Sequence, residues 1–220
     1  ETPVAPTSPT STWQTGDLVR DWLTFNVPPG LSAGPYTLRL GWVTPEGAPL
    51  AVRKDWLAAG DALALAPVQV HDREHRFEVP PMMFRQDVDF GDRARLLGYD
   101  ADTLSVEAGG RLDLTLYWQS LAEMDSSFKV FIHLVDGDGR IVAQQDSVPG
   151  GGSLPTTGWV ATEVLVDPHK LTLSTEIPAG EYEIRVGLYA ESDGARLPAM
   201  PGGQDYLRLT VVTVGPGEAQ

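Results

Sequence analysis

The chain alternates short apolar–polar segments with turns, and this pattern constrains its fold more than any other feature. Its 23 glycines and 18 prolines fall mainly between these segments, where they favour turns and interrupt longer helices. Four segments place large apolar side chains at alternate positions, which gives each one a face suited to a core. They are 112–118, 128–134, 182–188 and 207–211. The pattern predicts an all-β protein, an antiparallel β-sandwich of the Ig-like or jelly-roll-like kind.

The segment "VDGDGR", residues 135–140, separates two of the expected strands. Asp-Gly pairs suit the positive φ angles of a tight turn, so we expect residues 128–146 to form an antiparallel hairpin. Asp136 and Asp138 are also calcium candidates, because calcium loops space their carboxylates two residues apart. The later bidentate Glu of such a loop is missing, so the turn is the favoured interpretation.

An internal correspondence appears when Trp13 is aligned with Trp159. "AGPYTLRLGW" (33–42) then falls on "AGEYEIRVGL" (179–188), and "LALAPVQV" (63–70) matches "LRLTVVTV" (207–214) after a short slippage. The glycine near the end of the first pair indicates a bulge or a close approach. The correspondence predicts a tandem repeat whose first copy is incomplete. The expected divisions are 1–70, the second half of a first sandwich; 71–91, a linker; 92–214, a complete second sandwich; and 215–220, a tail.

Half a sandwich leaves an apolar face and at least one strand edge without cover. Residues upstream of Glu1 are the first candidate to complete it, because the chain begins with neither Met nor a signal-peptide pattern. Packing against the second domain and strand addition by another chain are the alternatives. We expect the chain to be a fragment of a longer protein.

Charge and composition exclude several classes of partner. Sixteen basic and 30 acidic residues give a net charge of −14, which disfavours nucleic acids and anionic lipid surfaces. The absence of cysteine excludes disulfides, thiolate metal sites and cysteine nucleophiles. No apolar run approaches the roughly 18 residues of a membrane span, so we expect no transmembrane segment in this chain, and upstream sequence could supply membrane attachment. We expect no cofactor.

A string of motifs resembles a known family of domains. The motifs are "FGDRARLLGYD" (90–100), "LTLYWQSL" (114–121), "FKVFIHLVDGDGRIVAQQD" (128–146), "PTTGW" (155–159) and "AGEYEIRVGLY" (179–189). Together they resemble the tandem extracytoplasmic β-sandwich tail domains of bacterial multispanning glycosyltransferases of the protein-mannosyltransferase type and of related surface proteins. The resemblance covers about 84–214, and again 9–70. It implies an exported, non-catalytic accessory module located outside the cytoplasm or at the cell surface.

The pentapeptide "LPTTG", residues 154–158, has the form of a sortase signal. Such a signal lies close to the C-terminus, before an apolar stretch and a basic tail, whereas strand-patterned sequence follows here. Pro155 and Thr156 also correspond to Pro9 and Thr10 in the first copy, where no such motif exists. We therefore interpret 154–158 as a loop before a strand that carries Trp159.

Tyr117, Phe131, His133 and Tyr189 are the candidate ligand-binding residues, because they lie on faces opposite the expected core. Exposed aromatic rings beside polar groups suit sugars, whose apolar C–H face stacks on a ring while their hydroxyls form hydrogen bonds. In a two-sheet sandwich, however, the commoner outcome is that such rings cover the edge of the core or a domain interface.

Catalytic and metal-binding motifs are poorly represented. His71 and His75 have the spacing of a helical metal pair, but the nearby Pro80-Pro81 argues against a helix. No catalytic residues and no metal site are expected. The favoured function is a non-catalytic extracytoplasmic module that spaces, docks or binds carbohydrate for a larger envelope protein. The alternatives are a structural subunit of a surface assembly, completed by strands from a neighbouring chain, and a carbohydrate-active enzyme.

Overall fold

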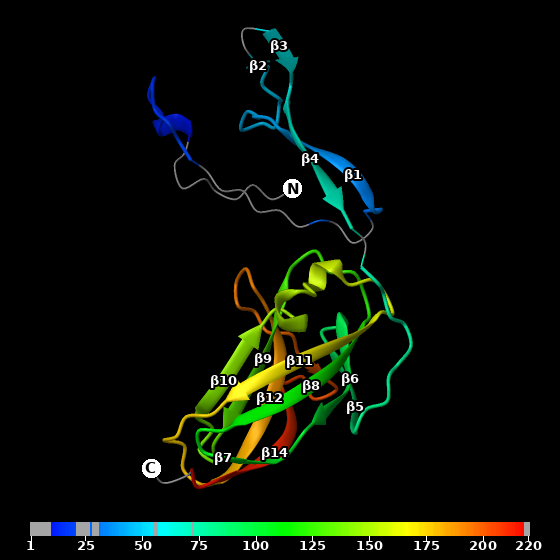
Figure 1. The fold of residues 1–220 in the computed structure, drawn as a ribbon, viewed down its shortest axis with the longest axis vertical. Helices are drawn as coiled ribbons and strands as arrows, with labels where there is room; N and C mark the ends of the chain where they lie inside the picture. Colours follow the sequence, from blue (N-terminus) through cyan, green and yellow to red (C-terminus); the bar gives the residue numbers. More distant parts are fainter. Residues whose placement is uncertain (1–9, 21–26, 28–30, 55–56, 72, 218–220) are drawn as a thin grey trace. The chain divides into compact units, whose positions relative to one another are not determined.

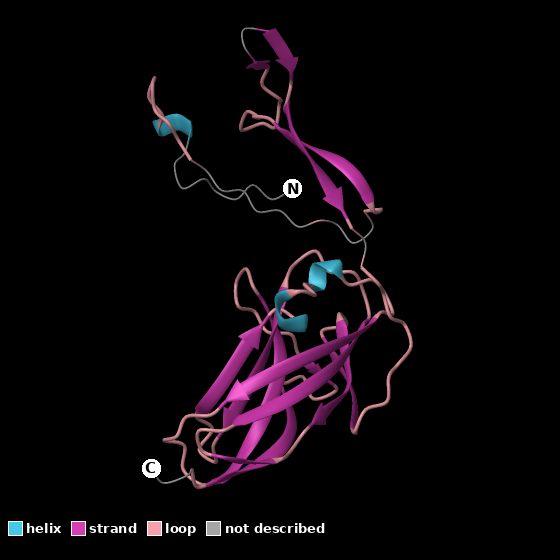
Figure 2. Ribbon diagram, viewed as in Figure 1, coloured by secondary structure: helices cyan, strands magenta, loops and turns pink. Residues whose placement is uncertain are grey.

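The computed structural model describes residues 10–20, 27, 31–54, 57–71 and 73–217. The chain divides into two compact units, one formed mainly from His75 onward and the other by Gly30–Glu74. Strands dominate both units, and the only helices in the described part are short 3-10 turns (Figure 2). None of these helices could cross a bilayer. The prediction of an all-β protein is confirmed.

The larger unit is a sandwich of two five-stranded sheets (Figure 1). The first sheet, in the spatial order β10-β9-β12-β14-β7, contains β7 (Ser105–Glu107), β9 (Phe128–Val135), β10 (Ile141–Ser147), β12 (Gly180–Ala190) and β14 (Leu207–Gly215). The second sheet, in the order β11-β8-β6-β5-β13, contains β5 (Phe84–Phe90), β6 (Ala94–Ala101), β8 (Arg111–Ser120), β11 (Val164–Thr172) and β13 (Ala199–Met200). Neighbouring strands are antiparallel except β7 and β14, which are parallel.

The central strands of both sheets are arranged as in an Ig-like sandwich. In that fold, strands B and E share one sheet while C, F and G share the other. Here β8 pairs with β11 in one sheet, and β9, β12 and β14 are neighbours in the other, in the matching sequence order. Strand β10 lies beside β9, where variable-type domains add strand C′. Of the two architectures that the sequence left open, the Ig-like one is observed.

The apolar faces predicted from the sequence form the core between the sheets. Its largest fully buried aliphatic side chains lie on five strands: Leu96, Leu112, Leu114, Leu116, Ile132, Leu134, Leu171 and Ile184. Leu209 and Val212 are buried as well, but Val211 is only half-buried, so the prediction that it faces the core is wrong. The reason is an irregularity in the β12–β14 pairing near Arg185, which shifts the inward face of β14 by one residue.

A buried polar cluster links the open edges of the two sheets. Asp167 on β11 is fully buried, and its carboxylate accepts hydrogen bonds from the Trp118 indole at 3.2 Å and the Gly150 amide at 2.7 Å. Its Oδ2 also lies 2.7 Å from His169 Nε2, while Nδ1 of that ring lies 2.9 Å from the Gln145 amide oxygen on β10. Each polar side chain of this cluster thus has a hydrogen-bonding partner, as buried polar groups in stable cores usually do.

The segment "LPTTG" forms part of a loop that packs on the sandwich. Thr156 is completely buried, and its hydroxyl accepts a hydrogen bond from the Phe128 amide and donates one to the Ser126 carbonyl. Trp159 is also fully buried and bonds back to the Leu154 carbonyl at 3.0 Å. The predicted loop is confirmed, although β11 begins only after Trp159. Of the corresponding residues in the first copy, Trp13 is 38% exposed and Pro9 lies outside the described residues.

The hairpin predicted for 128–146 is confirmed as β9 and β10. Oδ1 of Asp136 accepts hydrogen bonds from the amides of Asp138 and Arg140 at 3.0 and 2.8 Å. Gly139 has a φ of +82°, the conformation for which glycine is suited. The Asp136 carboxylate therefore closes the turn.

The sandwich begins within residues 71–91, which the sequence assigned to a linker. From Phe84 onward this range forms β5, an inner strand of the second sheet. Farther upstream, His75 Nδ1 lies 3.0 Å from Oε1 of the buried Glu163. The range therefore belongs structurally to the sandwich from His75 onward.

The smaller unit contains two hairpins. Strand β1 (Gly34–Leu40) pairs with β4 (Leu63–Val70), and β2 (Val52–Lys54) pairs with β3 (Leu57–Gly60), all antiparallel. The tandem repeat stays a prediction, as does the assignment of residues 1–70 to the second half of a first sandwich.

Candidate functional site

Three of the four candidate ligand-binding residues lie together on the outer face of the first sheet. Phe131 and His133 are on β9, and Tyr189 is on β12. The Phe131 ring centroid lies 4.6 Å from that of His133 and 6.4 Å from that of Tyr189. Side chains two residues apart on a strand share a face, and adjacent strands place their neighbours beside them. The sequence pattern predicted that Phe131 and His133 share a face, but it did not predict that Tyr189 lies beside them.

Gly187 makes room for the Phe131 ring. The two residues are directly opposite each other on β12 and β9. A Cβ added at Gly187 would lie only 2.4 Å from Cζ of Phe131, so the ring occupies the space of a side chain at this position. The close approach that the sequence analysis expected at this glycine is therefore present.

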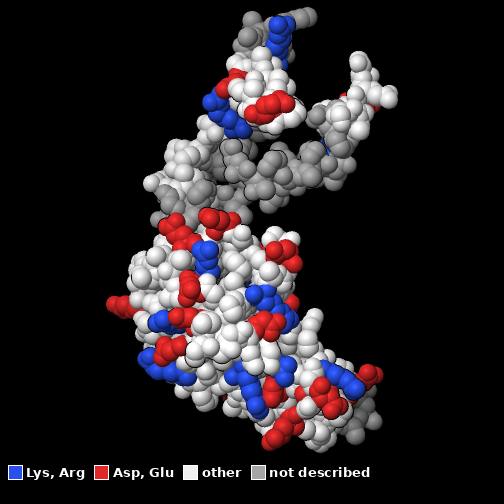
Figure 3. Space-filling model, turned by 180° about the vertical axis from the view of Figure 1, so that it is seen from behind, with Lys and Arg blue, Asp and Glu red and all other residues white. Residues whose placement is uncertain are grey.

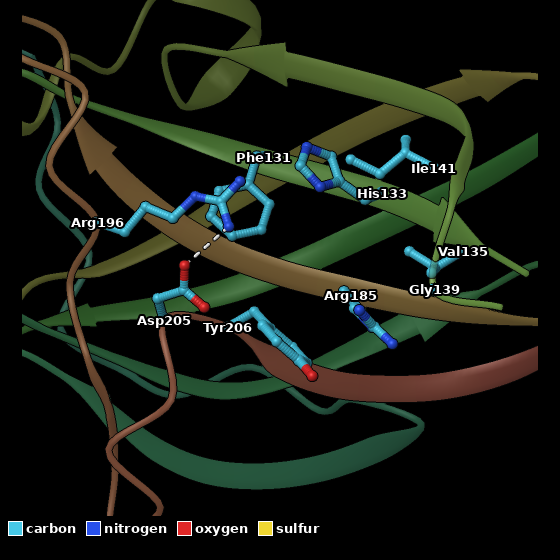
Figure 4. Close-up of a pocket in the computed structure, with 9 residues that line it drawn as sticks. All are labelled: Phe131, His133, Val135, Gly139, Ile141, Arg185, Arg196, Asp205 and Tyr206. Atoms are coloured by element: carbon cyan, nitrogen blue, oxygen red, sulfur yellow. Dashed lines mark hydrogen bonds and ion pairs between the residues drawn. The ribbon is translucent and has the colours of Figure 1, made fainter. Parts of the chain in front are cut away.

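The segment between β12 and β14 covers this aromatic group with charged side chains (Figure 4). The guanidinium carbon of Arg196 lies 4.4 Å from the Phe131 ring centroid, and its Nη1 bonds to Asp205 Oδ2 at 3.0 Å. Next to this pair, the guanidinium carbon of Arg185 lies 4.6 Å from the Tyr206 ring centroid. Both contacts have cation–π geometry, which orients guanidinium groups over rings.

These side chains enclose a pocket of about 120 Å³. Its lining consists of Phe131, His133, Val135, Gly139, Ile141, Arg185, Arg196, Asp205 and Tyr206. Pockets for drug-sized ligands usually measure about 300–1,000 Å³. The size and polarity of this one suit part of a small hydroxylated ring better than a large apolar ligand.

A second hollow of about 180 Å³ lies along the same face and shares Val135 with the first. Glu183, in its lining, pairs through Oε2 with Arg185 and through Oε1 with Arg208, both at 3.1 Å. Because Arg185 lines the first pocket, this carboxylate joins the two hollows. They form one polar surface along β9, β12 and β14, which we call the β9–β12 face.

Burial governs the protonation of two groups on this face. It lowers the pKa of His133, and this effect outweighs the opposing attraction of the Asp146 carboxylate 3.6 Å away. Burial also raises the pKa of Tyr189, with further contributions from Asp146. The imidazole is therefore held mainly in its neutral form near neutral pH, in which it can both donate and accept a hydrogen bond.

Tyr117 lies apart from the other three residues, on β8 in the second sheet. Its hydroxyl donates to Asp100 Oδ2 at 2.7 Å, and its ring packs against Leu97 and Val164. Burial, followed by the bond to Asp100, raises the pKa of Tyr117 to about 12. This residue forms a small satellite cluster on the other sheet and does not contribute to the pocket.

The expectation of exposed rings is wrong for three of the four candidates. Tyr117, Phe131 and His133 are only 8%, 1% and 6% exposed, because neighbouring side chains cover them. Tyr206, a half-buried ring in the pocket, was missed. Tyr206 precedes β14 in a turn-rich segment that lacks apolar–polar alternation. Nothing in the sequence therefore predicted that it would lie beside β12.

Acidic and basic groups are interspersed on the sandwich rather than collected in one patch. Figure 3 shows this mixture on one side of the molecule. Among the residues that the structure describes, no group of three His, Asp or Glu side chains could hold a metal ion. The β9–β12 face is thus a site of hydrogen-bond donors and acceptors with aromatic rings among them.

Comparisons with known proteins do not assign the chain to a family. No protein-family model matches the sequence, and no curated protein matches it. The solved structures similar to this chain include one described as the crystal structure of the C-terminal domain of wzt, with a TM-score of 0.44 and 12% sequence identity. The match covers 64% of this chain and 84% of that one.

Proposed function

We propose that this chain is a non-catalytic carbohydrate-binding module of a larger extracytoplasmic envelope protein. The observation that carries the proposal is the β9–β12 face, where a half-buried tyrosine and two arginines surround a small polar pocket. The envelope location rests on the resemblance of the sequence motifs to extracytoplasmic tail domains.

The chemistry of the pocket suits a sugar ring. Tyr206 offers an aromatic surface for the C–H face of a pyranose. A guanidinium carries five N–H donors, and the ion pair between Arg196 and Asp205 uses one nitrogen of that arginine. Its other donors suit hydroxyl oxygens, while Asp205 and neutral His133 supply acceptors. The pocket is small, so we expect it to bind one residue of a glycan while the chain of the glycan continues along the β9–β12 face.

A glycan array probed with the 220-residue chain tests this proposal, followed by calorimetric titration of the glycans that bind. Tyr206→Ala should weaken binding by about fivefold or more, because an aromatic contact of this kind contributes on the order of 1 kcal/mol beyond buried area.

Tyr117→Phe is the matched control, since it changes a tyrosine on the opposite sheet and should leave the affinity unchanged. Binding that survives Tyr206→Ala, or an array on which no glycan binds, contradicts the proposal.

A further inference from the structure

The β1–β4 hairpin of the smaller unit has the same pairing as β12 and β14 of the sandwich. Gly34 lies opposite Val70, and Gly180 lies opposite Val214. The sequence correspondence aligns these two pairs with each other. From this point the two hairpins continue in the same register, so they are equivalent in backbone pairing as well as in sequence.

Local details of the two hairpins agree as well. Both pairings shift register on reaching the matching arginines, Arg39 and Arg185. The Tyr36 hydroxyl donates to the carbonyl four residues upstream at 2.9 Å, and the Tyr182 hydroxyl does the same at 2.8 Å. A tyrosine with this bond marks the start of strand F in Ig-like sandwiches. Strand β1 is therefore built as the central strand of such a sheet.

In the sandwich, the two strands of this hairpin have further partners. Strand β12 pairs along its other edge with β9, and β14 pairs with β7. In the described part of the smaller unit, β1 and β4 pair only with each other. An unpaired edge presents a row of backbone donors and acceptors to any extended chain.

One face of the β1–β4 hairpin corresponds to the side of β12 and β14 that packs in the core of the sandwich. In the smaller unit this face is exposed. Leu65 and Val68 on β4 are 39% and 43% exposed, whereas their counterparts Leu209 and Val212 are 6% and 0% exposed. Trp42, just after β1, is 44% exposed, and its counterpart on β12 is fully buried. The hairpin thus combines an open edge with an uncovered apolar face.

We propose that the β1–β4 hairpin is a strand acceptor, which binds an extended polypeptide segment antiparallel along the free edge of β1, as β12 binds β9. The bound segment carries large apolar residues at alternate positions, because every second side chain must lie over the exposed face. Strand β9 of the same chain is not this segment, since β10 and β12 already occupy both of its edges. The same holds for β9 of a second copy. The occupant is therefore a different strand that, like β9, carries large apolar residues at alternate positions. The inference does not depend on carbohydrate binding.

A synthetic peptide covering residues 126–136, extended with lysines for solubility, serves as the probe. Hydrogen exchange of the 220-residue chain is measured with and without it. When the peptide is bound, the amides of β1 should exchange at about one tenth of their rate in the free chain, or more slowly still, because a new ladder of hydrogen bonds forms there. Exchange in β12 and β14 should not change.

Two pairs of variants separate strand addition from nonspecific adhesion. A peptide with Ile132→Pro should give no protection, because proline cannot continue the ladder. In the acceptor, Val68→Asp on the exposed apolar face should abolish protection, while Gln69→Asp, beside it on the opposite face, should preserve it.

Several results would overturn the inference. They are absence of protection by the unmodified peptide, equal protection by the proline peptide, and protection that survives Val68→Asp. A dimer of the chain alone in sedimentation, lost in Val68→Asp, would also overturn it by showing that a second copy covers the face.

Discussion

Gly187→Ala tests whether the Phe131 ring is held against the backbone of β12. The added Cβ would lie 2.4 Å from Cζ and 2.5 Å from Cε1 of that ring. Optimal carbon–carbon contact is at about 3.5 Å or more, so the ring must move by about 1 Å. That movement carries it toward the Arg196 guanidinium, whose carbon lies 4.4 Å from the ring centroid. The substitution therefore disturbs the centre of the β9–β12 face.

The expected cost follows from two opposing effects. Overpacking of this kind costs about 1–3 kcal/mol, whereas replacing glycine by alanine inside a strand gains about 0.5–1 kcal/mol. The net loss in the free energy of unfolding should be about 1–2 kcal/mol. In a Phe131→Ala background the clash is gone, and the same substitution at Gly187 should be neutral or stabilising.

Urea unfolding of the wild type, both single variants and the double variant measures this coupling. The cycle should give an interaction energy of about 1–3 kcal/mol between the two positions. Phe131→Leu provides a milder background if the alanine variant unfolds. An equal cost of Gly187→Ala in all backgrounds would refute the packing described for the ring.

Three further predictions concern other parts of the sandwich. Burial lowers the pKa of His133, so below its ordinary pKa of 6.5 the unfolded chain binds a proton that the folded chain does not, and stability should fall as the pH falls. Chemical denaturation at several pH values should show a smaller fall for His133→Asn, and an identical fall would count against this assignment. Asp167→Ala leaves the buried His169 and Trp118 N–H groups without their acceptor, so we expect a loss of about 3–5 kcal/mol in unfolding free energy, measured in urea. A loss below about 1 kcal/mol would show that the cluster is not structural. Asp136→Ala removes the acceptor of two turn amides and should lower the free energy of unfolding by about 1 kcal/mol. Calcium should not shift the thermal unfolding of either the wild type or the variant. A calcium-dependent shift in the wild type that is lost in the variant would instead support a calcium site.

The strands of the sandwich could be predicted because their alternation is regular over several residues. Leu112–Trp118 and Tyr182–Leu188 have period-two apolar faces, and burial on one side of a sheet requires that period. The orientation of Val211 could not be predicted in this way. An irregularity in strand pairing changes which residues of a strand face the core, and it leaves no pattern in the sequence.

The site was only partly predictable. Phe131 and His133 share a face by their spacing alone, so their proximity followed from the sequence. Arg196 and Tyr206 come from an irregular segment whose path depends on tertiary packing, and nothing in its sequence placed it over β9 and β12. Tyr117 has the same alternation as Phe131 but belongs to the other sheet, and alternation does not report which sheet a strand joins.

The most direct test of carbohydrate binding at the β9–β12 face is an NMR titration of the isotopically labelled chain with a glycan selected on the array. The account predicts chemical-shift changes at the amides of Phe131, His133, Arg185 and Tyr206, with no change around Tyr117 on the opposite sheet. Changes centred on the opposite sheet, or none at saturating glycan, would contradict it.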